Sequence, residues 1–165
     1  LETHFLNIGS SRKNEYDRAS KNLKFEIGGV DDVDWFISLY RSMFKAQGIN
    51  LVRGQISQLK GIITGSILNG SGLLMMARHN ANSKPISGIF VQRDFRTAYY
   101  QFSVSNEESR KLFATTFLLL NAFAMMKDEG YEVFDFMGVN SPHRGYFKTS
   151  FGGHLRGYFE IKASR

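Results

Sequence analysis

The sequence predicts a single α/β (α+β) domain with a mixed central sheet, in which an antiparallel meander is joined to a parallel crossover pair and flanked by helices. Three strand-like segments follow one another at hairpin distances, which indicates the meander. A long apolar helix then links the third segment to another apolar strand, and such a crossover makes the two strands that it joins parallel. An amphipathic helix ahead of the meander carries the apolar stripe needed to cover the sheet.

The composition is that of one folded domain. The chain has 165 residues, of which 42% are hydrophobic and 22% charged. Its formal net charge of +6 favours anionic partners such as nucleotides, phosphates or RNA. The absence of cysteine excludes disulfides, thiolate catalysis and zinc–thiolate sites. We interpret the densest basic patch as a solvated helix face rather than a nucleic-acid footprint, and it comprises Arg12, Lys13, Arg18, Lys21 and Lys24.

Four elements are expected ahead of the meander, and each has a local signal. They are a polar helix over 9–22 capped by Ser10 or Ser11, a strand over 23–29 that breaks at Gly28–Gly29, an amphipathic helix over 31–48 that stops at Gly48, and a helix over 54–68.

The meander and the crossover follow. The expected strands span 72–78, 86–92 and 97–105, and a single helix over 106–128 ends at Gly130. A strand over 131–137, buried on both faces, comes next, and a last strand over 154–162 closes the sheet.

The longest apolar run, residues 112–126, is shorter than the roughly 20 residues that a membrane span needs. No signal peptide opens the chain, so we expect a cytoplasmic protein. The chain does not begin with Met, which is consistent with a piece of a longer polypeptide.

The least ordinary stretch is "GYEVFDFMGVNSPHRGYFKTSFGG", residues 130–153, which ends in a Phe-Lys-x-x-Phe-Gly-Gly closure. With the element order, it resembles the GNAT acyltransferases, in the branch related to the Fem aminoacyltransferases and to acyltransferases found with polysaccharide genes. The opening "SRKNEYDRASKNLKFEI", residues 11–27, is similar to the start of the later domain in that branch. The resemblance implies a leading polar and basic helix over 1–22 and a GNAT-like acyltransferase domain over 23–165, as the C-terminal half of a tandem protein with a GNAT-like domain upstream.

The resemblance implies an N-acyltransferase or aminoacyltransferase, in which an amine attacks an activated acyl donor to form an amide. The acceptor would be an amino acid, a peptide or an amino sugar, in cell wall or polysaccharide biosynthesis. Acyl-CoA or aminoacyl-tRNA would be the co-substrate, with no permanently bound cofactor and no metal. The alternative is a non-catalytic half of a tandem Fem-like protein that binds RNA or a partner domain.

Three residues are the candidates for catalysis. Lys148 would neutralise a developing oxyanion or a nearby phosphate, as the resemblance implies; a surface lysine between two anchoring aromatics is the alternative. Asp135 would be a base or an orienting group, or else a structural acceptor that holds the following loop or pairs with Arg144 or Lys148. His143 has an ordinary pKa near neutrality, which suits a base, although a lone histidine in a loop is often incidental.

Seven residues are the candidates for substrate binding. Strict alternation over 97–105 places Ala98, Tyr100, Phe102 and Val104 on one face of the strand, and leaves an unusually polar opposite face that would line a cleft. The candidates on that polar face and in the later loop are Tyr99, Gln101, Ser103, Asn140, Ser141, Arg144 and Tyr146.

The donor is the open question. The glycine-rich pyrophosphate signature of many GNAT proteins is missing from the junction "VSNEESRKLF", residues 104–113. Ser105 and Glu108 instead predict a capping box, which places two glutamates at the positive end of the long helix. This favours an aminoacyl-tRNA donor, or a donor that binds elsewhere, over acetyl-CoA. Arg110 and Lys111 remain the candidates for contacting a phosphate of the co-substrate.

Overall fold

The structure is a computed structural model, and it describes residues 8–81, 84–139 and 142–157. Its centre is a five-stranded sheet in the order β1–β2–β3–β4–β5. The first four strands pair antiparallel and β4 pairs with β5 in parallel, so the predicted meander and crossover pair are confirmed. The strands are β1 (Leu23–Gly28), β2 (Gly72–His79), β3 (Pro85–Arg93), β4 (Thr97–Ser105) and β5 (Val133–Asp135).

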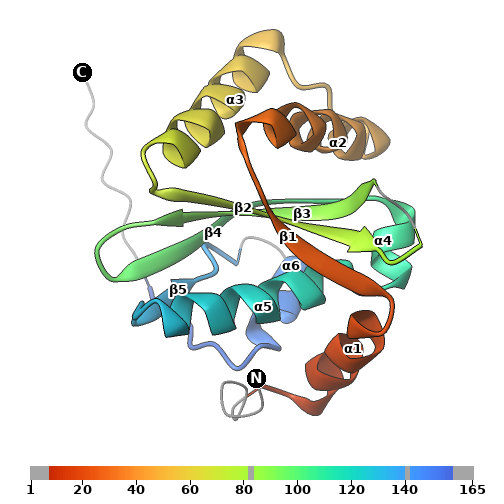
Figure 1. Cartoon of the computed structure of the whole chain (residues 1–165), viewed down its shortest axis with the longest axis vertical. Coiled ribbons are helices and arrows are strands. Elements are labelled where there is room, and N and C mark those ends of the chain that lie inside the picture. The colour runs from red at the N-terminus through yellow and green to blue at the C-terminus, as the bar shows by residue number, and fades with distance from the viewer. Residues whose placement is uncertain (1–7, 82–83, 140–141, 158–165) are drawn as a thin grey trace.

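Helices cover both faces of this sheet (Figure 1). One layer holds α2 (Val33–Ala46) and α3 (Arg53–Leu68), and the other holds α1 (Ser10–Ser20), α5 (Ala114–Asp128) and α6 (Pro142–Thr149). Two single turns, η2 (Val30–Asp32) and α4 (Glu107–Lys111), precede α2 and α5. None of the helices in the described ranges is long and apolar enough to cross a membrane.

The core has two halves, one on each face of the sheet. Met75 and Leu118 belong to the half that packs against α1 and α5, whereas Leu74 and Phe36 belong to the half that packs against α2 and α3. Because both faces of β2 are covered, its side chains are apolar along most of the strand instead of alternating.

The predicted single helix over 106–128 is wrong, because the chain breaks between α4 and α5. Phe113 lies in the left-handed region with φ 55° and ψ 33°, and its N–H bonds to the Arg110 carbonyl. The predicted capping box is also wrong. Asn106 is the cap of α4, and its Oδ1 accepts a hydrogen bond of 2.7 Å from the Ser109 N–H, while Ser105 still belongs to β4.

The predicted stop of α5 at Gly130 is confirmed. Gly130 has φ 87°, and two hydrogen bonds close the helix, from its own N–H to the Lys127 carbonyl and from the Tyr131 N–H to the Met126 carbonyl. This is a Schellman motif, which favours glycine at the left-handed position.

Three expectations near the chain ends need correction. The strand expected over 131–137 shrinks to the three residues of β5, an edge strand whose Val133 and Asp135 are exposed. Residues 154–157 are irregular, and the rest of the expected closing strand lies outside the described residues. Gly9 takes the cap position of α1, so neither Ser10 nor Ser11 caps it.

Candidate active site

The sheet opens between β4 and β5. Their pairing covers only three registers and ends at Tyr99 opposite Asp135, whereas β4 continues to Ser105. The later part of β4 therefore has no strand beside it on the β5 side among the described residues.

A β-bulge lies in β4 at the same place. Phe90 pairs with Phe102 and Val91 pairs with Tyr100, so Gln101 has no residue opposite it. Ala98 and Tyr100 consequently belong to the core half under α5, while Phe102 and Val104 pack in the half under α2. The prediction that all four share one face is wrong, because one inserted residue reverses the alternation beyond it.

A cleft of about 850 Å³ lies at this opening. Six elements contribute to it, which brings together residues far apart in the sequence. Its lining comprises Arg12, Glu15, Tyr40, Met43, Phe44, Gln47, Tyr100, Gln101, Phe102, Ser103, Ser105, Ser109, Arg110, Phe113, Ala114, Thr115, Thr116, Met137, Gly138, Phe147 and Lys148.

The charges of the cleft are mainly positive. Its described lining has three cations, Arg12, Arg110 and Lys148, and one carboxylate, Glu15. Such a surface attracts an anionic ligand.

Arg12 and Glu15 of α1 form an ion pair at the cleft wall, with side chains 11% and 17% exposed. Glu15 Oε2 also accepts a hydrogen bond of 2.6 Å from Thr116 Oγ1 in the first turn of α5. The Arg12 guanidinium donates to Ser150 Oγ at 2.7 Å and lies over the Phe147 ring at 4.7 Å. For Arg12, the interpretation of the basic patch as a solvated helix face is wrong.

Tyr100 is a cleft residue that sequence reasoning missed. It is 8% exposed, and burial raises the pKa of its hydroxyl to about 12, with partial compensation by a hydrogen bond to Ser103. The Lys148 ammonium lies 6.0 Å from the centre of its ring. The alternation pattern did not identify Tyr100 as a cleft residue, because it placed this side chain on the apolar face of the strand.

Lys148 lies in α6 and points at the backbone that follows β5. Its Nζ donates to the carbonyls of Phe136, Met137 and Gly138, at 2.6, 3.0 and 2.7 Å. Asp135 is exposed, and its Oδ1 accepts a hydrogen bond of 2.7 Å from the Met137 N–H. Two of the three predicted catalytic side chains, Lys148 and Asp135, thus hold the same short segment, and for Asp135 this is the loop-holding alternative.

Of the predicted binding residues, Gln101, Ser103 and Arg110 line the cleft, whereas three others do not belong to its lining. The Tyr99 hydroxyl donates to Asp94 Oδ2 at 2.6 Å at the β3–β4 turn, which raises the pKa of Tyr99. Tyr146 is exposed on α6, and Lys111 pairs with Glu107 at 2.8 Å.

The remaining candidates lie where the structure says little. His143 and Arg144 belong to the α6 backbone, but their side chains lie outside the described ones. Asn140 and Ser141 lie outside the described residues altogether.

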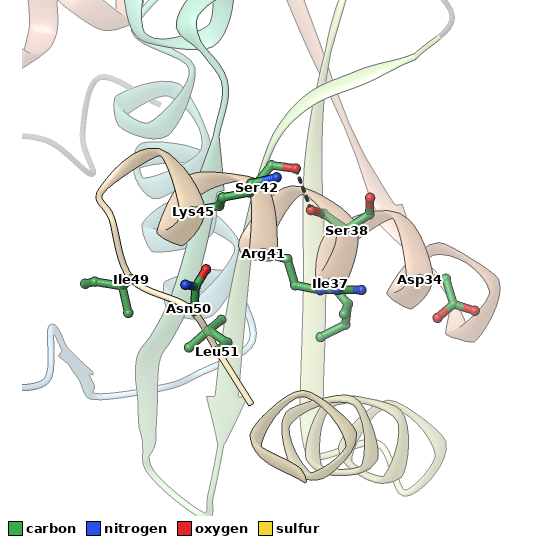
Figure 2. A pocket seen from close by; sticks show the side chains of 9 residues that line it. All are labelled: Asp34, Ile37, Ser38, Arg41, Ser42, Lys45, Ile49, Asn50 and Leu51. Atoms are coloured by element: carbon green, nitrogen blue, oxygen red, sulfur yellow. Dashed lines mark hydrogen bonds between the residues drawn. The ribbon is translucent and has the colours of Figure 1, made fainter. Parts of the chain in front are cut away.

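A second, smaller concavity of about 370 Å³ lies beside α2 and the segment that follows it (Figure 2). Its lining comprises Asp34, Ile37, Ser38, Arg41, Ser42, Lys45, Ile49, Asn50 and Leu51, all from one continuous stretch of the chain. Because the sheet and α6 contribute nothing to it, we place the candidate active site in the larger cleft.

Comparison with known proteins shows the family to which the chain belongs. Residues 10–148 match the family described as acetyltransferase (GNAT) domain. The chain matches no curated protein by sequence.

Solved structures share the fold at low sequence identity. A predicted acetyltransferase with acetyl-CoA from Clostridium acetobutylicum is 13% identical with a TM-score of 0.70, over 85% of this chain and 96% of that one. FemX is 12% identical with a TM-score of 0.74, over 90% of this chain, which spans 54% of the FemX chain. An aminoglycoside acetyltransferase from an uncultured soil metagenomic sample, in complex with sisomicin, is 13% identical with a TM-score of 0.59, over 87% of this chain and 99% of that one.

Proposed function

Because this chain belongs to the acetyltransferase (GNAT) family, we propose that it is an N-acyltransferase that joins an acyl-CoA thioester to a primary amine in the β4–β5 cleft. In this reaction the amine nitrogen attacks the thioester carbonyl carbon and the carbon–sulfur bond breaks. The sulfur leaves as a thiolate and takes up a proton, while the nitrogen loses one. The products are an amide and the CoA thiol.

The observation that carries the proposal is the opening of the sheet beside the bulge in β4. Beyond Tyr99, one edge of β4 faces the cleft instead of a neighbouring strand. Backbone N–H groups beside this strand are the oxyanion donors that the fold class implies, and preorganised donors stabilise the developing negative charge. Gln101 and Ser103 add polar side chains to the same wall.

Acyl-CoA as the donor is supported by the charge of the cleft and by the break between α4 and α5. Three cations line the cleft, and its only described carboxylate, Glu15, is paired with Arg12. The glutamates that we expected at the positive end of the long helix lie on the separate turn α4, whereas the first turn of α5 lines the cleft without an acidic residue. The expected objection to CoA therefore does not hold for α5.

The acceptor that we propose is a primary amine on an amino sugar, an amino acid or a peptide. The aminoglycoside acetyltransferase with sisomicin, which has the same fold, supports the amino-sugar class. An aminoacyl-tRNA donor, which the resemblance to the Fem aminoacyltransferases implies, is the second candidate function.

The test is calorimetric titration of the protein with CoA, followed by an assay of thiol release from acetyl-CoA with a panel of primary amines. We expect Arg110→Gln to weaken CoA binding by about ten-fold, because a charge-assisted phosphate contact is lost. Arg53→Gln, at the exposed start of α3, is the matched control and should leave the affinity unchanged. Binding of tRNA without any binding of CoA would overturn the proposal in favour of the second candidate. The predicted contact of Lys111 with the donor stays a prediction that the same titration can test.

A further inference from the structure

We propose that Lys148 and Asp135 are positioning residues that keep the active-site cleft open by turning residues 136–138 away from β4. This concerns the geometry of the cleft and is independent of the donor that it binds; the CoA-binding and activity measurements below rest on the proposed function, whereas the hydrogen-exchange measurement does not.

The register of β4 and β5 shows that the turn at residues 136–138 prevents the pairing of the two strands from continuing. Val133 lies opposite Thr97 and Asp135 lies opposite Tyr99. If the ladder continued, residues 136–138 would lie opposite 100–102 and would cover the edge of β4 that faces the cleft. The ladder instead ends at Asp135, and Met137 and Gly138 line the cleft.

The backbone of this segment is curled around the Lys148 ammonium. Three consecutive carbonyls, of residues 136, 137 and 138, point at one Nζ, and an ammonium has three protons to donate. Carbonyls of adjacent residues in a strand point in opposite directions, so this arrangement is incompatible with β pairing. Met137 has φ 56°, in the left-handed region that a side chain disfavours, and this strain has to be balanced by contacts.

Asp135 holds the same curl from the other side. Its carboxylate accepts a hydrogen bond from the Met137 N–H, while the Lys148 ammonium donates one to the Met137 carbonyl. Both polar groups of the strained residue are therefore bonded to charged side chains, and charge-assisted hydrogen bonds are the strong ones.

Packing fixes the positions of both ends of this arrangement. The Phe136 ring contacts the rings of Tyr100 and Phe151, with centroids 5.9 and 5.4 Å apart. Phe147, the neighbour of Lys148, lies against Arg12 of α1. The Lys148 ammonium thus extends from α6, which is held by packing, toward the end of β5, which is also held by packing. The three hydrogen bonds then fix the conformation of residues 136–138.

The experiment removes the ammonium and then relieves the strain. Lys148→Met should weaken CoA binding by ten-fold or more and lower transfer activity in proportion, because the cleft narrows. Lys148→Met combined with Met137→Gly should recover at least about five-fold in affinity, because glycine adopts the left-handed conformation without a side-chain penalty. Met137→Gly alone is measured as the baseline for the double variant. Lys127→Met, an exposed lysine at the end of α5, is the matched control and should bind CoA like the wild type.

Two results would overturn the inference. The first concerns a direct role of Lys148 on the oxyanion. In that case Lys148→Met keeps the CoA affinity of the wild type and lowers only kcat, and adding Met137→Gly to it does not change either value. The second readout is hydrogen exchange of the amides of 101–103, which we expect to become slower in folded Lys148→Met as the ladder extends; unchanged or faster exchange contradicts the inference. This readout applies to the unliganded protein, so it remains decisive even if the wild type binds no CoA. Lys148→Gln, which lacks the positive charge and the third proton, replaces Lys148→Met if the latter does not fold.

Discussion

Tyr100 lies beside the bulge in β4, with its ring against Phe136 and its hydroxyl group close to Ser103. Removal from water disfavours the charged phenolate, and this raises the pKa of Tyr100 to about 12 from an ordinary value of 10.0. In the unfolded chain, the Tyr100 hydroxyl ionises near its ordinary pKa. The folded state therefore holds the Tyr100 proton more tightly than the unfolded state does, and the resulting stability is present below pH 10 and is lost as the pH rises toward 12.

We predict that replacing Tyr100 with Phe removes this part of the pH dependence. Between pH 9 and pH 11.5, the wild-type free energy of unfolding should fall more than that of Tyr100→Phe, by about 2 kcal/mol, which is most of what a shift of two pKa units represents. Urea unfolding at the two pH values measures the difference. Tyr146→Phe, on an exposed side chain, is the control that should retain the wild-type dependence. Equal slopes in the wild type and in Tyr100→Phe would show that the Tyr100 hydroxyl is hydrated in the folded state.

At the scale of the elements, the junction between β4 and α5 differs most from expectation. The sequence there has the signature of a capping box, Ser105 with Glu108, yet Asn106 caps α4 one residue later. Both residues are typical caps, so local chemistry does not separate them. The bulge at Gln101 shifts the register of β4 by one residue, so that Ser105 lies in the strand opposite Ser87.

The two caps can be separated by substitution. Asn106→Ala should lower the free energy of unfolding by about 1 kcal/mol, because the hydrogen bond to the Ser109 N–H is lost. Ser105→Ala should change it by less than half as much. Chemical denaturation of both variants measures these changes. A larger loss of unfolding free energy in Ser105→Ala than in Asn106→Ala would indicate that Ser105 is the cap after all.

At the scale of the whole molecule, the first helix belongs to the active-site half of the fold. Arg12 of α1 donates to Ser150, 138 positions away in sequence, and Tyr16 stacks on Phe117 of α5 with ring centroids 5.6 Å apart. Through these contacts α1 and the region of α6 form one continuous wall of the cleft.

We predict that Arg12→Ala lowers the free energy of unfolding by about 1–3 kcal/mol, because the Glu15 side chain loses its ion-pair partner in a largely buried position. Lys24→Ala, an exposed cation on β1, is the control and should stay within about 0.5 kcal/mol of the wild type. Thermal and urea unfolding measure both changes. A loss for Arg12→Ala no larger than that of the control would mean that α1 is only loosely attached.

The amino-acid sequence by itself determined the type and order of most elements. Hydrophobic periodicity identified α2 and α3, hairpin spacing identified the meander, and Gly130 marked the end of α5. These signals suffice because each arises within a few residues of the chain, where propensity, capping and turn geometry act.

Only the tertiary structure decided what the cleft is made of. Gln101 becomes a bulge through pairing with β3, and Phe113 takes a left-handed conformation although no glycine or proline lies beside it. Arg12 is partly covered by Phe147 of α6. Lys148 was singled out from its motif, but its three carbonyl partners were not. The physical reason is that these features depend on contacts between segments far apart in the sequence, and a local pattern contains no information about the partner that a side chain meets after folding.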